Sequence, residues 1–308
     1  MSEPSVSVII PAYRAANTIA RAVDSLLAQT RRPDEILIID DGSPDNLAAA
    51  VAHYGDQVTL ITKPNGGAAT ARNLGIERSI GEFITFLDAD DYWEPDKLQR
   101  QLKVFIDHPE VVFAAGQYYE QPPNEARSLR KLEGDGRYLG KVSVTSGTEA
   151  FTLARLIWTT TVIVRRSILG DQRFFSGLEP AEDLDLWIRL MADRPMYFDA
   201  EPLATWVLEP GSLSRSSLDV DCGNMLRVVR RNAELLGPQG LQTWEANTFK
   251  RWAGNHLAQG RPRAALKPAF ARLKRQPLAL DGWYILLKSL AVASLSRPSR
   301  QHRDTIRG

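Results

Sequence analysis

The first 115 residues alternate between short apolar runs and longer segments of helical periodicity, and this alternation limits the fold more than any other feature. The apolar runs, rich in Val, Ile, Leu and Phe, are typical of buried strands. They span residues 6–10, 35–39, 58–62, 83–87 and 111–115. The segments between them are typical of helices, and in the first of them Ile19, Val23, Leu26 and Leu27 fall on one face. The main ones span residues 18–29, 46–54, 68–78 and 97–107. Strands joined through helices run parallel, so the pattern predicts an α/β fold with a mostly parallel sheet covered on both faces.

The rest of the chain is less regular at first and then helical. Residues 117–147 contain Pro122, Pro123 and several glycines, which favour loops and edge structure. Further expected elements are strands at residues 160–164 and 204–208 and a helix at residues 182–191. After Gly211 the pattern is helical almost to the end. We therefore expect an α/β domain at residues 1–215 and a basic helical extension at residues 216–308.

Composition excludes several classes of protein. The 308 residues are 44% apolar with a net charge of +1, which fits a globular chain with a substantial core. Because Cys222 is the single cysteine and the four histidines are scattered, neither a disulfide framework nor a site of clustered Cys or His is expected. The N-terminus shows no secretory signal, and the longest late apolar stretch is interrupted by Lys288 and Ser289. We expect a cytoplasmic protein.

Polar clusters follow four of the expected structural elements. They are Pro11-Ala12-Tyr13, Asp40-Asp41-Gly42-Ser43, Asn65-Gly66-Gly67 leading to Ala71-Arg72-Asn73, and Asp88-Ala89-Asp90-Asp91. Loops after parallel strands lie along one edge of the sheet, where open α/β sheets bind ligands. We expect these clusters to converge on one crevice.

Each cluster has a chemical use in holding a nucleotide. Tyr13 could stack on a base, and Asp41 could accept a hydrogen bond from a ring N–H. The two glycines before the helix at residues 68–78 would let main-chain N–H groups approach a ligand. Arg72 could bind phosphate oxygens or a base, and Asp90 could hold a divalent cation that bridges two phosphates. Taken singly, each has an ordinary reading: a packed tyrosine, a plain turn, a surface arginine, or a loop that caps a helix.

Five motifs in a fixed order carry a resemblance to a known family. They read Val-Ser-Val-Ile-Ile-Pro-Ala-Tyr, Ser-Leu-Leu-Ala-Gln-Thr, Ile-Ile-Asp-Asp-Gly-Ser, Ala-Arg-Asn-Leu-Gly-Ile and Phe-Leu-Asp-Ala-Asp-Asp-Tyr-Trp-Glu-Pro-Asp-Lys-Leu. The chain resembles the family-2 glycosyltransferases of the GT-A fold over residues 5 to about 115, and again over residues 174–190. The resemblance implies that residues 1–215 form the catalytic domain.

The resemblance implies inverting transfer of a sugar from a nucleotide-diphosphate donor, expected to be a UDP-sugar, to a hydroxyl of a glycan or lipid-linked glycan. Such a step belongs in surface polysaccharide or glycolipid assembly. Carried over by position, the resemblance implies that the nucleotide-contacting residues are Pro11, Tyr13, Asp41 and Arg72. The D-x-D pair that binds ribose and metal (Mn²⁺ or Mg²⁺) corresponds to Asp88 and Asp90. The catalytic base corresponds to Asp183.

Two positions leave questions open. Asp183, with Glu182 and Asp185 beside it, could simply place a carboxylate in the first turn of a helix, where the dipole favours it. Many relatives have a histidine after the last strand, whereas this chain has Glu209 near that position. Glu209 could be an oxygen ligand of the metal, or that ligand could be absent.

Two other functions are considered beside glycosyl transfer. A nucleotidyltransferase would use the same sheet edge, but it is expected to carry a Gly-rich, basic phosphate loop after the first strand. Here that loop reads Tyr13-Arg14-Ala15-Ala16. A non-catalytic nucleotide-sugar-binding scaffold would not need Asp88, Asp90 and Asp183.

The C-terminal region is basic. From Cys222 onward sixteen Lys and Arg face four Asp and Glu, so the preceding part carries eleven excess negative charges. Apolar residues around Trp283 lie among the cations, a pattern that can bind peripherally to the anionic inner face of a membrane. The alternative is a helical cap with solvated charges, and both stay open. We expect no nucleic-acid partner, because no binding motif accompanies the charge.

Overall fold

The computed structural model describes residues 3–130, 138–208 and 217–295. Contacts divide the chain into two compact units. The first comprises Met1–Arg215 with Glu234–Leu236, and the second comprises Ser216–Ala233 with Gly237–Gly308.

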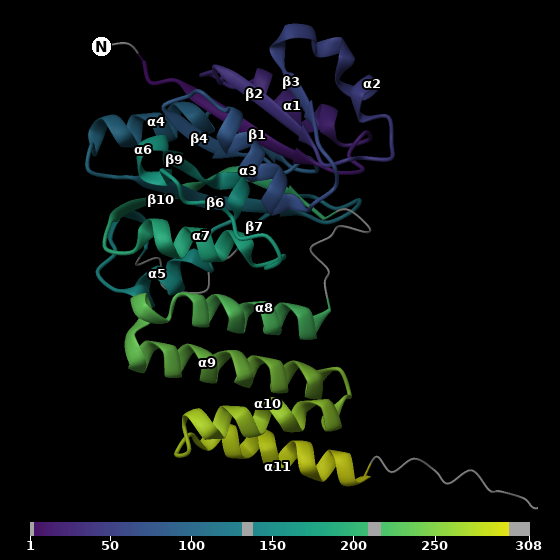
Figure 1. Ribbon diagram of the computed structural model, residues 1–308, viewed down its shortest axis with the longest axis vertical. Coiled ribbons are helices and arrows are strands. Elements are labelled where there is room, and N and C mark those ends of the chain that lie inside the picture. The colour runs from purple at the N-terminus through teal and green to yellow at the C-terminus, as the bar shows by residue number, and fades with distance from the viewer. Residues whose placement is uncertain (1–2, 131–137, 209–216, 296–308) are drawn as a thin grey trace, which may run out of the picture. The chain divides into compact units, whose positions relative to one another are not determined.

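The first unit combines strands and helices (Figure 1). Its strands are β1 (Val6–Ala12), β2 (Glu35–Asp40), β3 (Thr59–Thr62), β4 (Phe83–Phe86), β5 (Tyr92–Trp93), β6 (Phe113–Gln121), β7 (Ser128–Leu129), β8 (Gly140–Ser143), β9 (Ile163–Arg165) and β10 (Pro195–Val207). Its α-helices are α1 (Ile19–Leu27), α2 (Leu47–Val51), α3 (Ala68–Arg78), α4 (Lys97–Asp107), α5 (Gly147–Ala154), α6 (Arg166–Leu169) and α7 (Glu182–Met191). Two 3₁₀ turns, η1 (Ala52–Gln57) and η2 (Thr159–Thr161), complete it.

The strands form one sheet in the order β3-β2-β1-β4-β9-β6-β10-β5, with β7 beside β6 and β8 beside β10. The pairs β2–β3, β1–β2, β1–β4 and β6–β10 are parallel. β9 is antiparallel to both β4 and β6. The expected α/β architecture, a GT-A-like sheet flanked by helices, is confirmed.

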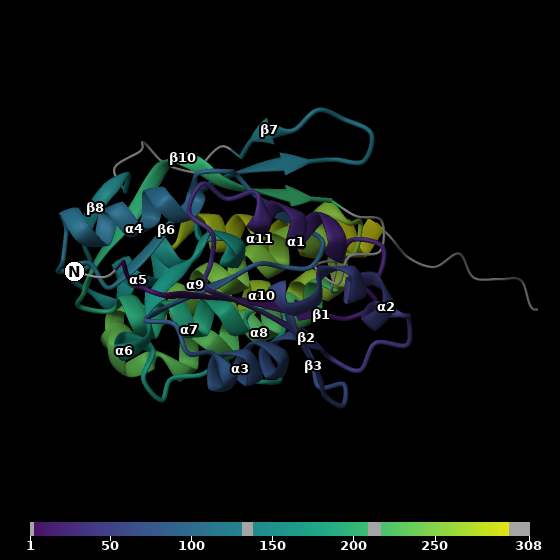
Figure 2. The ribbon, with the colours of Figure 1, turned by 90° about the horizontal axis from the view of Figure 1, so that it is seen from above.

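Alternation along β1 explains why helices cover both faces. Val8 and Ile10 belong to the core formed with α1 and α4. Ile9 points to the other face, where α3 approaches so closely that a Cβ on Gly75 would lie 2.3 Å from Ile9 Cγ2. Figure 2 shows α1 and α4 on one side of the sheet and α3 and α7 on the other. On the α7 side, Trp187 packs against three phenylalanine rings at 5.4–5.8 Å between centroids, those of Phe86, Phe113 and Phe174.

Several boundaries agree with the sequence prediction and others differ. α3, α4 and α7 have the predicted bounds, whereas β6 and β10 are longer than predicted. Thr160 and Thr161, predicted as the start of a strand, belong to the turn η2 instead, and the strand β9 begins at Ile163. The reason is local: Thr161 Oγ1 donates to the Trp158 carbonyl at 2.7 Å, and Thr161 N donates to the same oxygen at 2.9 Å.

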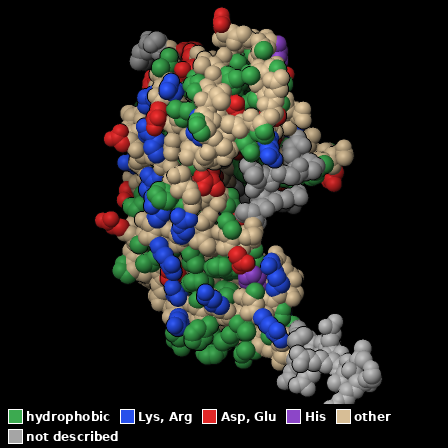
Figure 3. Space-filling model, turned by 45° about the vertical axis from the view of Figure 1, so that its right-hand side comes forward, with side chains coloured by type: hydrophobic (Ala, Val, Ile, Leu, Met, Phe, Trp, Pro, Cys, Tyr) green, Lys and Arg blue, Asp and Glu red, His purple; other side chains and the backbone are tan. Residues whose placement is uncertain are grey.

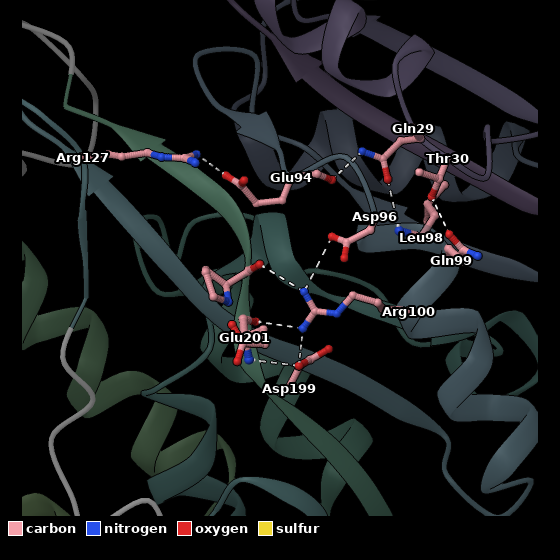
Figure 4. Close-up of polar contacts among 11 residues, drawn as sticks. Gln29, Thr30, Glu94, Asp96, Leu98, Gln99, Arg100, Arg127, Asp199 and Glu201 are labelled. Atoms are coloured by element: carbon pink, nitrogen blue, oxygen red, sulfur yellow. Dashed lines mark hydrogen bonds and ion pairs between the residues drawn. The ribbon is translucent and has the colours of Figure 1, made fainter.

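A polar network fixes the segment between β5 and α4 (Figure 4). Gln29 Nε2 donates to the Glu94 carbonyl at 2.7 Å and its Oε1 accepts from Leu98 N at 3.1 Å. Arg100 donates to Asp199 at 2.5 Å, where β10 shifts register between Asp199 and Ala204. The chain that leaves the acidic cluster is therefore anchored to α1 on one side and to β10 on the other.

The second unit is helical. Its helices are α8 (Leu218–Arg231), the greater part of α9 (Ala233–Ala258), α10 (Pro262–Arg275) and α11 (Leu280–Leu295). α9 is interrupted at Gly237, which has a φ of 63° and precedes Pro238. Among the residues that the structure describes, no helix has the length and apolar character to cross a bilayer.

Candidate active site

The carboxyl ends of β1, β2 and β4 bring three of the polar clusters to one edge. β1 lies between β2 and β4, and the ladder continues past the strands: Asp41 N donates to Ala12 O at 2.9 Å and Leu87 N donates to Ile9 O at 3.1 Å. Arg14 N donates to Ser43 Oγ at 3.1 Å, so the loops after β1 and β2 are in contact. The sequence prediction that these loops share an edge agrees with this arrangement.

Arg72 connects this edge to the start of α7. It is buried in α3, and its guanidinium donates at 2.8 Å to Asp88 Oδ1 and at 2.8 Å to Glu182 Oε1. Burial alone would lower the pKa of Arg72, but the carboxylates of Asp88 and Glu182 raise it above its ordinary value, so the side chain stays charged. The reading of Arg72 as a surface charge is therefore wrong.

Asp183 lies in the first turn of α7, next to Glu182. Its Oδ2 accepts from Thr159 Oγ1 at 2.8 Å and its Oδ1 accepts from Leu184 N at 2.6 Å. Burial raises the pKa of Asp183, whereas the positive charge of Arg72 and the Thr159 hydroxyl act in the opposite direction. Burial also raises the pKa of Glu182 to about 7, and the neighbouring Asp183 adds to the rise. A carboxylate with a raised pKa, beside a cation, has the character of a general base.

The three aspartates after β4 have different surroundings. Asp88 and Asp90 are partly exposed, whereas Asp91 is fully buried. Asp91 accepts from Trp158 Nε1 at 3.0 Å, from Thr160 Oγ1 at 3.0 Å and from Val207 N at 3.1 Å. Burial raises the pKa of Asp91 well above its ordinary value, and the charges of Asp88 and Asp90 add to the rise. Asp91 therefore connects η2 and β10 to the acidic turn through hydrogen bonds.

Asp41 organises the loop that precedes α3. Its buried carboxylate accepts from Gly67 N at 2.7 Å, from Gly66 N at 3.0 Å and from the Lys63 ammonium. A carboxylate has about four acceptor positions, so most of those on Asp41 are used within the protein. Gly67 has a φ of 88°, a conformation that favours glycine, and it is the N-cap of α3. The nucleotide contact expected for Asp41 stays a prediction.

Pro11 and Tyr13 lie at the end of β1. Pro11 is half-buried and pairs with Ile39. Tyr13 is 36% exposed, and the Arg14 guanidinium lies 5.3 Å from the centroid of its ring. An exposed aromatic ring at the ligand-binding edge of a sheet suits stacking against a base, and the role predicted for Tyr13 remains to be tested.

The described residues offer few protein ligands for a divalent cation, but their carboxylate chemistry suits one. The described residues contain no group of three or more His, Cys, Asp or Glu side chains arranged to hold a metal ion. One oxygen of Asp88 pairs with Arg72, and Asp90, the second carboxylate of the D-x-D pair, is partly exposed. Mg²⁺ commonly binds through one or two carboxylates together with substrate phosphates, so a preformed cluster is not required. Glu209 lies outside the described residues.

The structure also identifies partners that the sequence reasoning missed. Glu182 is the second partner of Arg72, although the two are 110 positions apart. The segment Trp158-Thr159-Thr160 contacts Asp183, Asp88 and Asp91. The run of three threonines before a strand was the available signal, because hydroxyl-rich turns often bond to neighbouring polar groups.

The chain is similar in sequence to known glycosyltransferases. Residues 7–170 match the family model described as "Glycosyl transferase family 2". An uncharacterized glycosyltransferase of Rickettsia typhi is 33% identical over 204 residues, which are 65% of this chain and 63% of that protein. The chain therefore spans somewhat under two thirds of this relative's length. The hyaluronan synthase of Pasteurella multocida is 45% identical over 106 residues, 33% of this chain and 11% of that protein.

Solved structures share the fold at low sequence identity. S. aureus TarS 1-349 in complex with UDP-GlcNAc superposes with a TM-score of 0.68 and 18% identity, covering 94% of this chain and 89% of that chain. The mannosyltransferase PcManGT of Pyrobaculum calidifontis in complex with GDP-Man and Mn²⁺ gives a TM-score of 0.55 and 18% identity, covering 96% and 81%.

Proposed function

Because the chain belongs to glycosyl transferase family 2, we propose that it transfers a sugar, with inversion, from a nucleotide-diphosphate donor to a hydroxyl of an acceptor glycan. The observation that supports this most is the pairing of Arg72 with both Asp88 and Glu182 at 2.8 Å. One guanidinium thereby joins the acidic turn at the sheet edge to the helix turn that carries Asp183. A donor bound at the acidic turn would place its sugar near the helix turn that carries Asp183.

Asp183 is the proposed base. The acceptor hydroxyl gives its proton to the Asp183 carboxylate, its oxygen bonds to the anomeric carbon, and the bond to the nucleoside diphosphate breaks on the opposite side. A hydroxyl is a poor nucleophile, and a positioned base contributes about 10²–10⁴ in rate. No covalent intermediate is needed, so the site requires no nucleophilic Ser or Cys.

Pro11, Tyr13, Asp41, Arg72 and Asp88 are the proposed donor-binding residues. We favour a UDP-sugar, since TarS is described with UDP-GlcNAc, although PcManGT is described with GDP-Man. The similarity to hyaluronan synthase supports a polysaccharide or glycolipid acceptor.

We propose that a divalent cation binds beside Asp90. When bound there, Mn²⁺ or Mg²⁺ would neutralise charge that develops on the departing diphosphate. The description of PcManGT with Mn²⁺ supports Mn²⁺ as the first ion to try. Asp90 would be its protein ligand, and Asp88 would contact the nucleotide.

A thermal-shift screen of nucleotide sugars, each with and without Mn²⁺, tests the proposal. A cognate donor raises the unfolding temperature, because ligands that bind only the native state stabilise it. Release of nucleoside diphosphate with a hydroxyl acceptor then identifies transfer. Release of pyrophosphate would instead indicate a nucleotidyltransferase, and binding without any turnover would indicate a scaffold.

A further inference from the structure

Helix α11 is apolar on two opposite faces. On one face Ile285 and Leu286 pack against the small cluster of Ala253, Ala265 and Ala269 in α9 and α10. The other face is exposed, with Leu280 83%, Tyr284 63% and Leu287 60% accessible. Trp283, Leu290 and Val292 are also exposed on this helix. A helix whose outer side faces only water carries polar residues there. The exposed apolar face of α11 therefore indicates contact with an apolar partner or phase.

Cations lie among these apolar side chains. Between residues 259 and 295 there are seven Lys and Arg and a single acidic residue, Asp281. The Lys288 ammonium lies 5.7 Å from the centroid of the Tyr284 ring. On α10 the Lys274 ammonium lies 5.3 Å from the ring of the exposed Phe270. Figure 3 shows hydrophobic side chains gathered at the end of the second unit with Lys and Arg around them.

We propose that the exposed face of α11, with the cations of α10 beside it, docks on an anionic lipid surface. Trp and Tyr favour the boundary between headgroups and acyl chains, where an apolar ring and a polar edge are both accommodated. Leu280, Leu287 and Leu290 would enter the acyl boundary. Each lysine or arginine near the surface strengthens binding about fivefold through anionic headgroups. The helix, 16 residues long, would lie in the interface rather than cross it.

Charge argues against a second copy of the chain as the occupant. An isologous contact brings the same patch of each protomer together, so it needs carboxylates to meet the cations. Asp281 is already engaged, at 2.7 Å by Lys250 and at 3.0 Å by Arg272. Two such faces would set like charges against each other, whereas an anionic membrane complements both the apolar and the cationic side chains.

Co-flotation of the full chain with lipid vesicles tests the inference. We expect binding to phosphatidylcholine vesicles that contain phosphatidylglycerol, weak binding to phosphatidylcholine alone, and weaker binding at high salt. The double variant Leu287→Ser/Leu290→Ser should bind about tenfold or more weakly, because two leucines no longer enter the apolar phase. Lys274→Gln/Lys288→Gln should bind roughly 30-fold more weakly, on anionic vesicles only.

Ile80→Ser is the matched control. Ile80 is 82% exposed but belongs to the first unit, so its loss should leave vesicle binding unchanged. The proposal would be overturned if the wild-type chain did not bind vesicles or if its binding did not depend on phosphatidylglycerol. Binding by the leucine variant equal to that of the wild type would overturn it as well. A dimer in light scattering that dissociates in the leucine variant would assign the face to a second copy instead. None of these readouts depends on glycosyl transfer, so the test of membrane binding is independent of the proposed function.

Discussion

The Thr159 hydroxyl donates a hydrogen bond to Asp183 Oδ2 at 2.8 Å, and this contact ties η2 to the first turn of α7. The other carboxylate oxygen accepts from Leu184 N. Both oxygens are thus oriented by the protein. A donor to a carboxylate stabilises its charged form, so Thr159 both positions Asp183 and opposes the rise in its pKa that burial causes.

Replacing the proposed base should abolish transfer while donor binding persists. Asp183→Asn keeps the size of the side chain and can still accept from Thr159, but it cannot take a proton at neutral pH. We expect turnover to fall by about 10²–10⁴, measured as nucleoside diphosphate release, with an unchanged thermal shift by donor. Asp185→Asn is the control, since Asp185 bonds to Arg189 at 3.1 Å instead. Near-normal turnover in Asp183→Asn would remove it as the base.

Thr159→Val should move the acid limb of the pH–rate profile to higher pH. The base must be ionised, so activity rises as pH increases through the pKa of Asp183. Loss of the hydroxyl removes one of the effects that lower this pKa, while Arg72, the Leu184 N–H and Asp88 still act on it. Thr159→Ser retains the hydroxyl and should restore the original limb. Identical profiles for valine and threonine would limit Thr159 to a packing role.

Asp90→Asn should weaken the metal-dependent part of donor binding. With one ligand carboxylate removed, the added thermal stabilisation that Mn²⁺ gives in the presence of donor should shrink or vanish. Asp96→Asn changes a nearby carboxylate that lies 3.7 Å from Arg100 and should behave as wild type. If the Mn²⁺ increment were the same in Asp90→Asn as in the wild type, Asp90 would not be the ligand.

Lys97→Met should stabilise the protein. Lys97 is fully buried, with its ammonium 2.7 Å from Gln101 Oε1 and 3.8 Å from the centroid of the Trp93 ring, and burial lowers its pKa well below the ordinary value. The unfolded chain therefore binds more protons at this lysine, and the cost to the folded state grows as pH falls.

Methionine fills a similar volume without this cost. Replacing a buried ion pair by apolar residues of similar volume is often neutral or stabilising by about 1–4 kcal/mol. The loss of the hydrogen bonds that Lys97 donates to Gln101 and Thr85 offsets part of the gain. Thermal unfolding between about pH 6 and 9 should show an advantage for Lys97→Met that shrinks as pH rises. Lys103→Met, at an exposed lysine of the same helix, should show no such trend. A variant less stable than wild type at every pH would contradict this account.

The sequence predicted the elements of the first unit well where local pattern decides. α3, α4 and α7 have the bounds that the sequence indicated, and the strands before the polar clusters coincide with the apolar runs. The common edge of these clusters followed from parallel connectivity. Local pattern is enough for these features because each depends on neighbours a few residues apart.

The missed features depend on partners distant in sequence. Nothing near Glu182 indicates that it pairs with Arg72, and nothing near Asp41 shows that Lys63 and two glycine N–H groups fill its acceptor positions. Thr159 was missed for a related reason: β-branched threonines favour strands, and their turn depends on hydroxyl bonds within the turn and to the carboxylates of Asp91 and Asp183.

The shared guanidinium of Arg72 has a consequence for redesign. A substitution at Asp88 that accommodates another donor would also withdraw a negative neighbour from the arginine, and so alter the charge balance that Glu182 and Asp183 experience. Sugar preference and pH optimum would then change together, and a library aimed at new donors would need to vary positions 88 and 182 jointly to separate them.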